Sequence, residues 1–380
     1  MRIEQRPPNR LRAALYGAGA LLLALLMGLT AAAQGHAAAG WQPVPPPAAS
    51  GLSAYVPFDA TSAVARSTVQ TSTTCLPCEY EHTLWTRQAG AWSALPLPPA
   101  GASTDVLTGT APNDVWALGR GERDFGQYHW DGSRWTDRTV PDFEVLAARA
   151  VSRTDVWAVG NYRESDGDVP GAVAHWNGSA WTLTKLGAPD AWTNIKAVHV
   201  ASAHDVWVVG SGGGRLYAAH YDGMSWQEVA LPRLSGLSAT ANAVTVRNGE
   251  VWIGGTDRNI YTDSGTPRAF VLHGNGTDWQ TTYVPVPAPT GDASEDRMSV
   301  QALAVHDGTV WAGLYAHRAK DRGLARWNGS TWETAAAPGA TPGSEVTALY
   351  PTADGTLWAN GLQYPNAYLK GYAASLAPSA

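Results

Sequence analysis

The sequence predicts an all-β protein built as a seven-bladed β-propeller with four-stranded blades. Three observations predict this fold: two series of tryptophans repeat along the chain, tight-turn dipeptides recur in step with them, and one end of the chain carries a strand that the other end lacks. The tryptophans of each series are separated by roughly 40 to 60 residues, a period that is typical of propeller blades.

The two tryptophan series mark two different strands of each unit. The first series, on the outermost strand, is Trp41, Trp92, Trp135, Trp181, Trp226, Trp279 and Trp332. The second series, on an inner strand, is Trp116, Trp157, Trp207, Trp252, Trp311 and Trp358. In the clearest unit, residues 197–229, four β-rich runs follow one another. Four strands for each period match a blade whose strands a, b, c and d run outward from the axis.

The turn between strands c and d has the same chemistry in five units. Asn-Gly or Asp-Gly supplies the positive φ that a tight hairpin needs. The copies are Asp131-Gly132, Asn177-Gly178, Asp222-Gly223, Asn275-Gly276 and Asn328-Gly329. The three asparagines also satisfy the pattern for N-glycosylation, but the turn interpretation covers the aspartate copies too, and we favour it.

The two ends of the chain are expected to meet in the last blade. The final unit ends after a strand near Tyr372 and has no strand d, whereas residues 40–46 resemble an isolated strand d. Pairing of the two closes the ring and removes an exposed sheet edge. We therefore predict a single domain over residues 40–375, with blades at 51–98, 104–141, 144–187, 194–232, 240–285, 299–338, and 344–373 together with 40–46.

The N-terminal segment has the pattern of a secretory signal peptide. Four arginines precede an apolar stretch from Ala13 to about Leu29, and small residues continue to Ala39. We predict a signal peptide over residues 1–33, or up to residue 39, and a secreted or extracytoplasmic protein. An uncleaved membrane anchor is the alternative, because the apolar stretch is long for a signal peptide. Scarce lysine beside plentiful arginine, alanine, glycine and proline indicates a GC-rich bacterial genome.

The only two cysteines, Cys75 and Cys78, lie in the irregular first unit, where the other units have their second-series tryptophan. In an exported protein we expect a structural disulfide between them, in preference to a redox centre, free thiols or half of a zinc site. No cofactor and no metal are expected.

The formal net charge is −6. The predicted signal peptide carries four Arg and one Glu, so that its removal makes the charge more negative. An acidic protein is a poor partner for nucleic acid. We expect a monomer that contacts a membrane only if the N-terminal segment is retained.

Candidate binding residues gather on one face of the predicted ring. The a-to-b and c-to-d turns are short and share one face, whereas the longer b-to-c and d-to-a connections share the other, and binding residues concentrate on loops of a rigid scaffold. Arginine binds carboxylate and phosphate groups in a bidentate fork, and tyrosine offers a flat surface for a sugar ring. The candidates are Arg123, Tyr162, Arg163, Asp166, Arg215, Asp257, Arg258, Tyr261, Arg318, Asp321, Arg322 and Tyr364.

Two further sets of residues recur at fixed places in the blades. His129, His175, His220 and His273 share one register on strand c, with Arg326 in the next unit. Because different blades hold them apart, they are expected to pack or hydrogen-bond within the blade and not to bind one metal ion. Asp114, Asp155, Asp205 and Glu250 stand just before strand b, where we expect a bond to the local turn backbone.

With these turns in view, the repeat resembles neuraminidase-type, or Asp-box, propellers and the related two-component-regulator propeller repeats. The nearest copies are Asp307-Gly308-Thr309-Val310-Trp311 and Asp354-Gly355-Thr356-Leu357-Trp358, which lack one residue of the Asp-box consensus. For sialidases the resemblance would imply an arginine triad and a tyrosine nucleophile with a glutamate, roles that no motif here assigns.

Families that share such repeats include sialidases, assembly factors and glycan-binding proteins, so the repeat alone does not fix the function. We expect a secreted or cell-surface protein that recognises a glycan or a protein on its long-loop face without catalysis. The alternatives are a sialidase-like glycoside hydrolase on the same face and an envelope scaffold or assembly factor.

Overall fold

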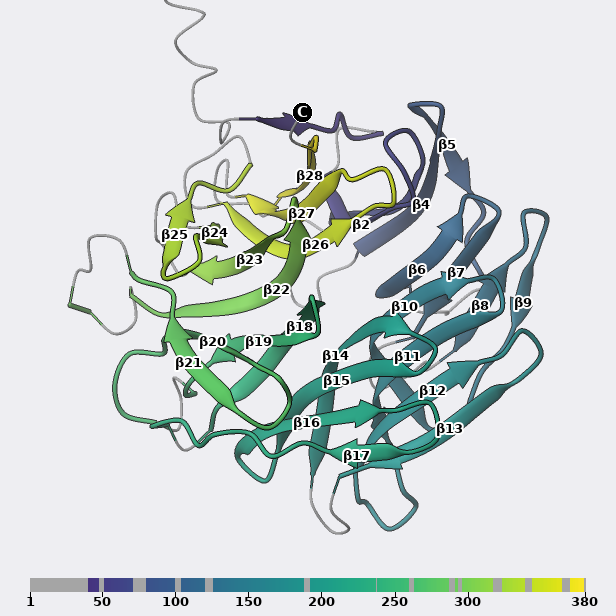
Figure 1. The fold of residues 1–380 in the computed structure, drawn as a ribbon. Coiled ribbons are helices and arrows are strands. Elements are labelled where there is room, and N and C mark those ends of the chain that lie inside the picture. The colour runs from purple at the N-terminus through teal and green to yellow at the C-terminus, as the bar shows by residue number, and fades with distance from the viewer. Residues whose placement is uncertain are drawn as a thin grey trace, which may run out of the picture.

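In the computed structural model, the described residues form seven four-stranded antiparallel sheets arranged around one axis (Figure 1). These residues are 40–47, 51–70, 80–99, 104–119, 126–187, 192–236, 238–259, 263–286, 291–292, 296–316, 323–338, 344–363 and 370–378. The prediction of an all-β, seven-bladed propeller is confirmed. We number the sheets as blades one to seven in chain order.

The innermost strand of each blade comes first in the chain, and the next two follow outward. Blades one to three consist of β2 (Leu52–Pro57), β3 (Ala63–Gln70), β4 (Tyr80–Gln88) and β5 (Ala91–Leu95); β6 (Val106–Ala111), β7 (Asp114–Leu118), β8 (Gln127–Trp130) and β9 (Trp135–Asp137); and β10 (Phe143–Ser152), β11 (Asp155–Tyr162), β12 (Gly171–Trp176) and β13 (Trp181–Leu186).

Blades four to six repeat the same order. They consist of β14 (Thr193–Ser202), β15 (Asp205–Gly212), β16 (Arg215–Tyr221) and β17 (Trp226–Glu228); β18 (Thr240–Arg247), β19 (Glu250–Thr256), β20 (Ala269–Gly274) and β21 (Trp279–Tyr283); and β22 (Met298–His306), β23 (Thr309–Ala316), β24 (Leu324–Trp327) and β25 (Trp332–Ala335).

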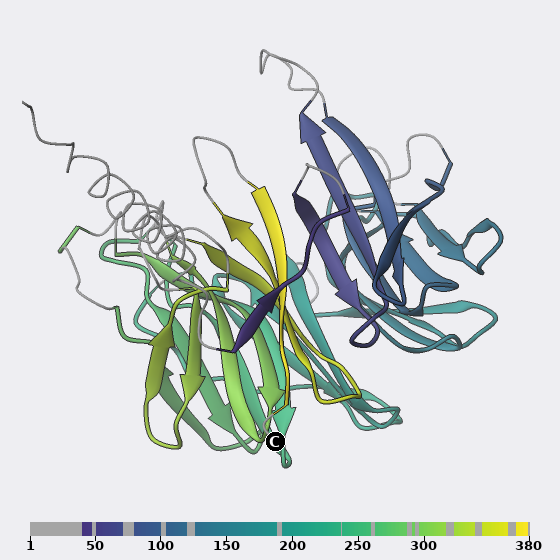
Figure 2. The ribbon, with the colours of Figure 1, turned by 90° about the horizontal axis from the view of Figure 1, so that it is seen from above.

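Blade seven joins the two ends of the described chain. It contains β26 (Glu345–Pro351), β27 (Leu357–Gln363) and β28 (Lys370–Leu376), and its outermost strand is β1 (Trp41–Pro43). β1 runs antiparallel to β28, with Trp41 opposite Leu376, and the two strands lie side by side in Figure 2. Trp41 is 4% exposed. The N-terminal strand therefore completes the last blade, as the sequence predicts.

The two tryptophan series meet between neighbouring blades. The outer tryptophan of one blade packs edge-on against the inner tryptophan of the blade before it. These pairs are Trp181 with Trp116, Trp226 with Trp157, Trp332 with Trp252, and Trp41 with Trp311, at ring-centroid distances of 5.2, 6.1, 6.2 and 6.3 Å. Edge-to-face aromatic pairs add about 0.5–1.5 kcal/mol each to the burial of their area. The period of the sequence is thus the period of the contacts that hold the blades together.

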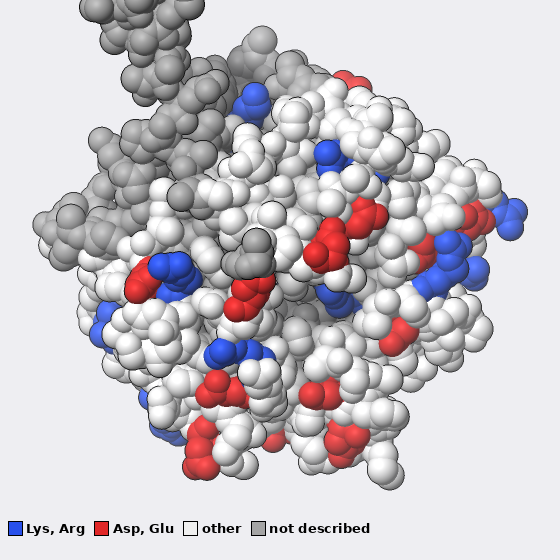
Figure 3. All heavy atoms as spheres, turned by 45° about the horizontal axis from the view of Figure 1, so that its top comes forward, with Lys and Arg blue, Asp and Glu red and all other residues white. Residues whose placement is uncertain are grey.

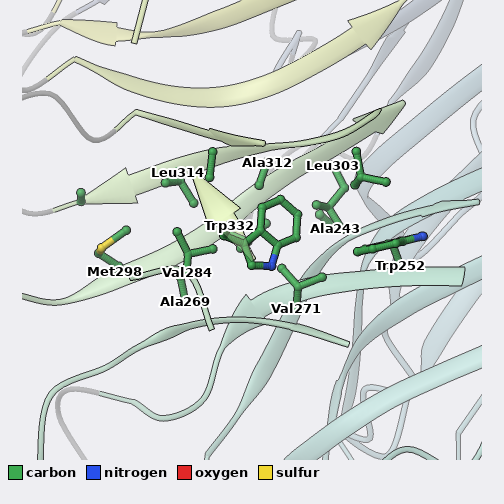
Figure 4. Close-up of a cluster of buried hydrophobic side chains, with 14 residues drawn as sticks. Ala243, Trp252, Ala269, Val271, Val284, Met298, Leu303, Ala312, Leu314 and Trp332 are labelled. Atoms are coloured by element: carbon green, nitrogen blue, oxygen red, sulfur yellow. The ribbon is translucent and has the colours of Figure 1, made fainter. Parts of the chain in front are cut away.

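One such interface, between blades five and six, is shown in Figure 4. Trp332 points into a cluster of aliphatic side chains that includes Val271, Ala312 and Leu303, with Trp252 at its edge. Met298 belongs to the same cluster and is 1% exposed. The cluster gives the start of β22 a fixed position.

The repeated histidines stack on the inner tryptophans of their own blades, and each contacts the repeated acidic residue. His129 lies 4.5 Å from the ring of Trp116, and its Nε2 is 2.7 Å from Oδ1 of Asp114. The same arrangement joins His175 to Asp155 and His220 to Asp205, each at 2.9 Å, and His273 to Glu250 at 3.1 Å. The interpretation of the histidines as packing and hydrogen-bonding residues is confirmed. The expected bond of the acidic residues to the local turn is wrong, because strand c brings a stronger partner alongside.

The c-to-d turns are Asx turns, as predicted. In all five, Oδ1 of the Asn or Asp accepts bonds from the backbone N–H groups two and three residues later, and the following glycine has a φ between 94° and 103°. Asn177, Asn275 and Asn328 thus have a structural role that needs no glycan.

A β-bulge recurs in the innermost strand of six blades. The bulged residues are Ser53, Leu146, Lys196, Asn242, Gln301 and Thr347, and all of them line a cavity of about 340 Å³ on the axis. In four blades the residue of strand b that lies opposite the bulge is glycine. A Cβ added there would lie only 1.8–1.9 Å from a carbonyl oxygen of strand a, so no larger residue fits without a shift of the backbone.

Three predictions fall wholly or partly outside the described residues: the signal peptide, the membrane anchor and the disulfide between Cys75 and Cys78. Within the part of the chain that the structure describes, no helix is long and apolar enough to span a bilayer.

Candidate functional site

The two faces of the ring have connections of different length. On the hairpin face, strands a and b are joined by two residues in blades three to six, for example 153–154 and 307–308. On the long-loop face, the connections include 163–170, 229–239 and 257–268. The long-loop face therefore has the variable surface, as predicted.

A hollow of about 300 Å³ opens on the long-loop face between blades five and six; we call it the interblade pocket. Its walls come from the entry to β18, the end of β19 with its following loop, the entry to β22 and the end of β23. The lining residues are Ser238, Thr240, Thr256, Arg258, Asn259, Pro267, Arg297, Met298, Ser299 and Tyr315. Hydroxyl, amide and guanidinium groups thus surround a partly apolar floor formed by Met298.

An arginine and a tyrosine lie together in this pocket. Nη2 of Arg297 donates to the hydroxyl oxygen of Tyr315 at 3.4 Å, and its guanidinium carbon lies 6.0 Å from the centre of the Tyr315 ring. Both side chains are half-buried. Arg297 immediately precedes Met298, whose side chain is fixed in the core. The fold therefore holds a positive charge and an aromatic ring at one wall of the pocket.

The opposite wall depends on a buried carboxylate. Asp257 has no exposed surface, and its Oδ2 lies 2.8 Å from Nη2 of Arg268, while its Oδ1 lies 3.3 Å from Nε of Arg258. Arg258 also donates to the hydroxyl of Ser235 at 3.0 Å and to the carbonyl of Ser264 at 2.7 Å. Two positive charges compensate the buried negative charge. Of these two predicted site residues, Arg258 lines the pocket, whereas Asp257 holds the loop behind it.

The predicted residues of blade three lie on a separate loop. Lys185 Nζ lies 2.6 Å from Glu164 Oε1 and 4.3 Å from the centre of the Tyr162 ring. Lys185 therefore covers one side of the Tyr162 ring. Arg163 is exposed and lies 4.0 Å from Glu144, while Asp166 is exposed at the loop tip. The structure does not bring these residues into the interblade pocket.

Arg215 begins β16 and is exposed on the same face. The remaining candidates lie outside the described residues: Arg123, Tyr261, Arg318, Asp321, Arg322 and Tyr364. Arg297 and Tyr315 were not predicted. Arg297 directly precedes β22 and Tyr315 is the second-last residue of β23, so both lie where a strand meets a long connection.

The axial cavity is a second, more enclosed space. Tyr350 on β26 also lines it, and the inner strands β10 and β14 carry Arg149 and His199. Burial and the nearby charge of Arg149 lower the pKa of His199 to about 4. Burial also raises the pKa of Tyr350, although the charge of Arg149 acts in the opposite direction. His199 is therefore neutral at pH 7.

Acidic and basic side chains of the described residues are interspersed on the face shown in Figure 3. Among the described residues, no group of three or more His, Cys, Asp or Glu side chains is arranged to hold a metal ion.

Comparison with known protein families finds no match for this chain, and comparison with curated proteins finds none either. Solved structures do match. The β-propeller domain of the Trilobed protease from Pyrococcus furiosus is similar over 85% of this chain and 93% of that one, with 9% identity and a TM-score of 0.52. That propeller is described as having an open velcro topology, whereas here β1 pairs with β28.

Two further structures are similar at lower scores. PorZ, a surface component of the type-IX secretion system of Porphyromonas gingivalis, matches 80% of this chain and 44% of its own, with 13% identity and a TM-score of 0.44. An α-L-arabinanase from Penicillium chrysogenum matches 86% of this chain and 98% of its own, with 10% identity and a TM-score of 0.42. At these identities the similarity supports the propeller fold alone, and the resemblance to neuraminidase-type repeats stays a prediction.

Proposed function

We propose that this protein is a secreted or cell-surface binding protein that recognises an acidic carbohydrate in the interblade pocket, without catalysis. The observation that supports this most directly is the combination of Arg297, Arg258 and Tyr315 around a hollow of about 300 Å³. Small-ligand sites are concave, with a few placed polar groups that fix orientation. Guanidinium groups bind carboxylates, and a tyrosine ring offers a surface for a sugar ring.

The absence of catalysis is inferred from what lines the pocket. Canonical glycoside hydrolysis needs two carboxyl groups that flank the scissile bond, and sialidases replace one of them with a tyrosine. None of the described lining residues is Asp or Glu, and the neighbouring Asp257 is enclosed by Arg258 and Arg268.

The test is a glycan array that includes sialylated sugars and bacterial cell-wall fragments, probed with the chain from residue 40 onward. We expect binding to acidic glycans, with at least a tenfold loss of affinity in Arg297→Ala and in Tyr315→Ala. Arg134→Ala is the matched control, because Arg134 is 79% exposed on the hairpin face. An array without any specific signal, or equal binding by Arg297→Ala and wild type, would contradict the proposal. Release of free sugar by the wild type would support the sialidase-like alternative.

A further inference from the structure

Trp192 departs from the pattern of every other tryptophan in the chain. It belongs to neither repeating series and lies on the connection that enters β14. Its side chain is 67% exposed, while all the other tryptophans are buried or half-buried. A ring this exposed takes no part in the blade packing that buries the other tryptophans.

The backbone around Trp192 is held in place although the side chain is exposed. The carbonyl of Trp192 accepts a bond from the N–H of Gly213 at 3.3 Å, and the N–H of Thr193 donates to the carbonyl of Val169 at 3.4 Å. Thr193 is 2% exposed and pairs with Gly212. Trp192 is thus tied to the loops of blades three and four, which fixes the place from which its ring projects.

The surroundings of the ring are open and polar. The turn that bonds to it is glycine-rich, and a Cβ added at Gly213 would meet no atom within 4 Å. Arg215 follows this turn and is exposed, and Asp166 and Asp168 are exposed on the loop of blade three. A protein-binding hot spot is usually enclosed by a rim of contacts that exclude water, which is not the situation here. A flat exposed ring, with charged side chains on the loops to which its backbone is bonded, suits a sugar, whose faces are apolar and whose edges hydrogen-bond.

Trp192 and the interblade pocket occupy corresponding places in their blades of the propeller. Trp192 stands directly before the first paired residue of β14, Thr193, and Arg297 stands directly before the first paired residue of β22, Met298. The inner strands β14, β18 and β22 belong to consecutive blades, and packed sheets lie roughly 10 Å apart. Trp192 is therefore about one blade from the near wall of the pocket at Ser238.

We propose that Trp192 is a stacking platform for a second sugar ring of the same ligand, so that the protein recognises an extended acidic oligosaccharide. This inference rests on the proposed function of the interblade pocket. Arg215 is placed to bind a carboxylate or hydroxyl group of the stacked unit, while the pocket holds the acidic group of another unit.

The test compares ligand lengths by isothermal titration, with oligomers of sialic acid and of a uronic acid containing two or six units. We expect the wild type to bind one of the hexamers at least tenfold more tightly than its dimer. Trp192→Ala should bind that hexamer only as tightly as the dimer, and its affinity for the dimer should be unchanged. Trp192→Phe should keep most of the length dependence, and the Tm of both variants should stay at the wild-type value because the ring is exposed.

Three results would overturn the inference. Equal affinity of the wild type for dimer and hexamer would mean that no unit beyond the dimer is bound. Full length dependence in Trp192→Ala would remove the ring from the sugar site and indicate a protein partner for it. Loss of dimer binding in Trp192→Ala would make the ring part of the first subsite. The proposed function survives each of these results, and it fails separately if Arg297→Ala binds the dimer as the wild type does.

Discussion

The hairpin face and the long-loop face of this propeller are built in opposite ways. On the hairpin face the same contacts recur from blade to blade: an Asx turn, a histidine on a tryptophan, and an acidic partner for the histidine. On the long-loop face Asp257 is buried between two arginines in one blade, Trp192 is exposed in another, and Lys185 covers Tyr162 in a third. Repetition therefore encodes the scaffold, and departure from it encodes the surface that can select a ligand.

The largest effect on the scaffold is expected from removing the closing strand. Deletion of residues 40–46 takes Trp41 from the core of blades six and seven and leaves β28 as an exposed edge. Loss of a buried tryptophan alone costs about 3–5 kcal/mol, so we expect Tm to fall by roughly 10 °C or more. Calorimetry of the chain from residue 40 and of the deletion variant would measure this.

The matched substitutions Trp41→Ala and Trp192→Ala sharpen the comparison. Trp41 is 4% exposed and Trp192 is 67% exposed. We expect several kcal/mol of lost stability for the first and less than about 0.5 kcal/mol for the second. A deletion variant with unchanged Tm would show that the N-terminal strand does not close the ring.

The next effect concerns the histidine–carboxylate pairs of the hairpin face. Asp114 has no exposed surface, and it accepts bonds from His129 and Thr110; although burial alone would raise the pKa of Asp114, these bonds lower it. Asp114→Ala leaves two polar groups without a partner, and we expect a loss of about 3 kcal/mol in urea unfolding at pH 7.

Asp205 is the matched control, because it makes the same pair with His220 while its side chain is 40% exposed. For Asp205→Ala we expect a loss of about 1 kcal/mol, since water replaces the missing partner. Equal losses in the two variants would contradict the view that burial sets the strength of these pairs.

A smaller effect is expected from the inner strands at low pH. Burial first, and then the charge of Arg149, lower the pKa of His199 to about 4, while Asp205 acts in the opposite direction. The unfolded chain binds a proton at His199 near pH 6.5, whereas the folded chain does so only near pH 4, so stability falls as the pH falls through this window. After allowance for the partial solvent exposure of His199, the expected loss is about 2 kcal/mol.

His199→Gln should remove this part of the acid sensitivity. Urea unfolding of the wild type and the variant at pH 7 and at pH 4 measures the difference. Parallel losses in the two proteins would show that His199 is not the group that titrates.

Much of the scaffold could be predicted because its contacts follow the period of the sequence. The two tryptophan series, the Asn-Gly and Asp-Gly turns and the unpaired segment around Trp41 all report on blades directly. The pairing of Asp114 with His129 was missed because the partner lies 15 residues away on strand c, while the turn offers an alternative close by. The inner bulges have a sequence signal of their own, a glycine three residues after Trp157, Trp207, Trp252 and Trp358.

The candidate site was harder to predict. Arg258 lines the interblade pocket, but nothing local distinguishes it from Asp257, which is buried against Arg268 eleven residues further along the chain. Arg297 lies on the connection before β22 and Tyr315 lies at the end of β23, and only the folded blade brings them within 3.4 Å. Residue type indicates what chemistry a side chain can supply, but the folding of the blade decides which side chains come together in one site.

The central claim, that the long-loop face binds the ligand and the hairpin face supports it, is tested most directly by hydrogen–deuterium exchange with and without the sugar that binds best on the array. We expect slower exchange in peptides that cover 238–240 and 296–299 and no change at the turns 131–134 and 177–180. Protection at those turns, with none around 238–240 and 296–299, would contradict the account.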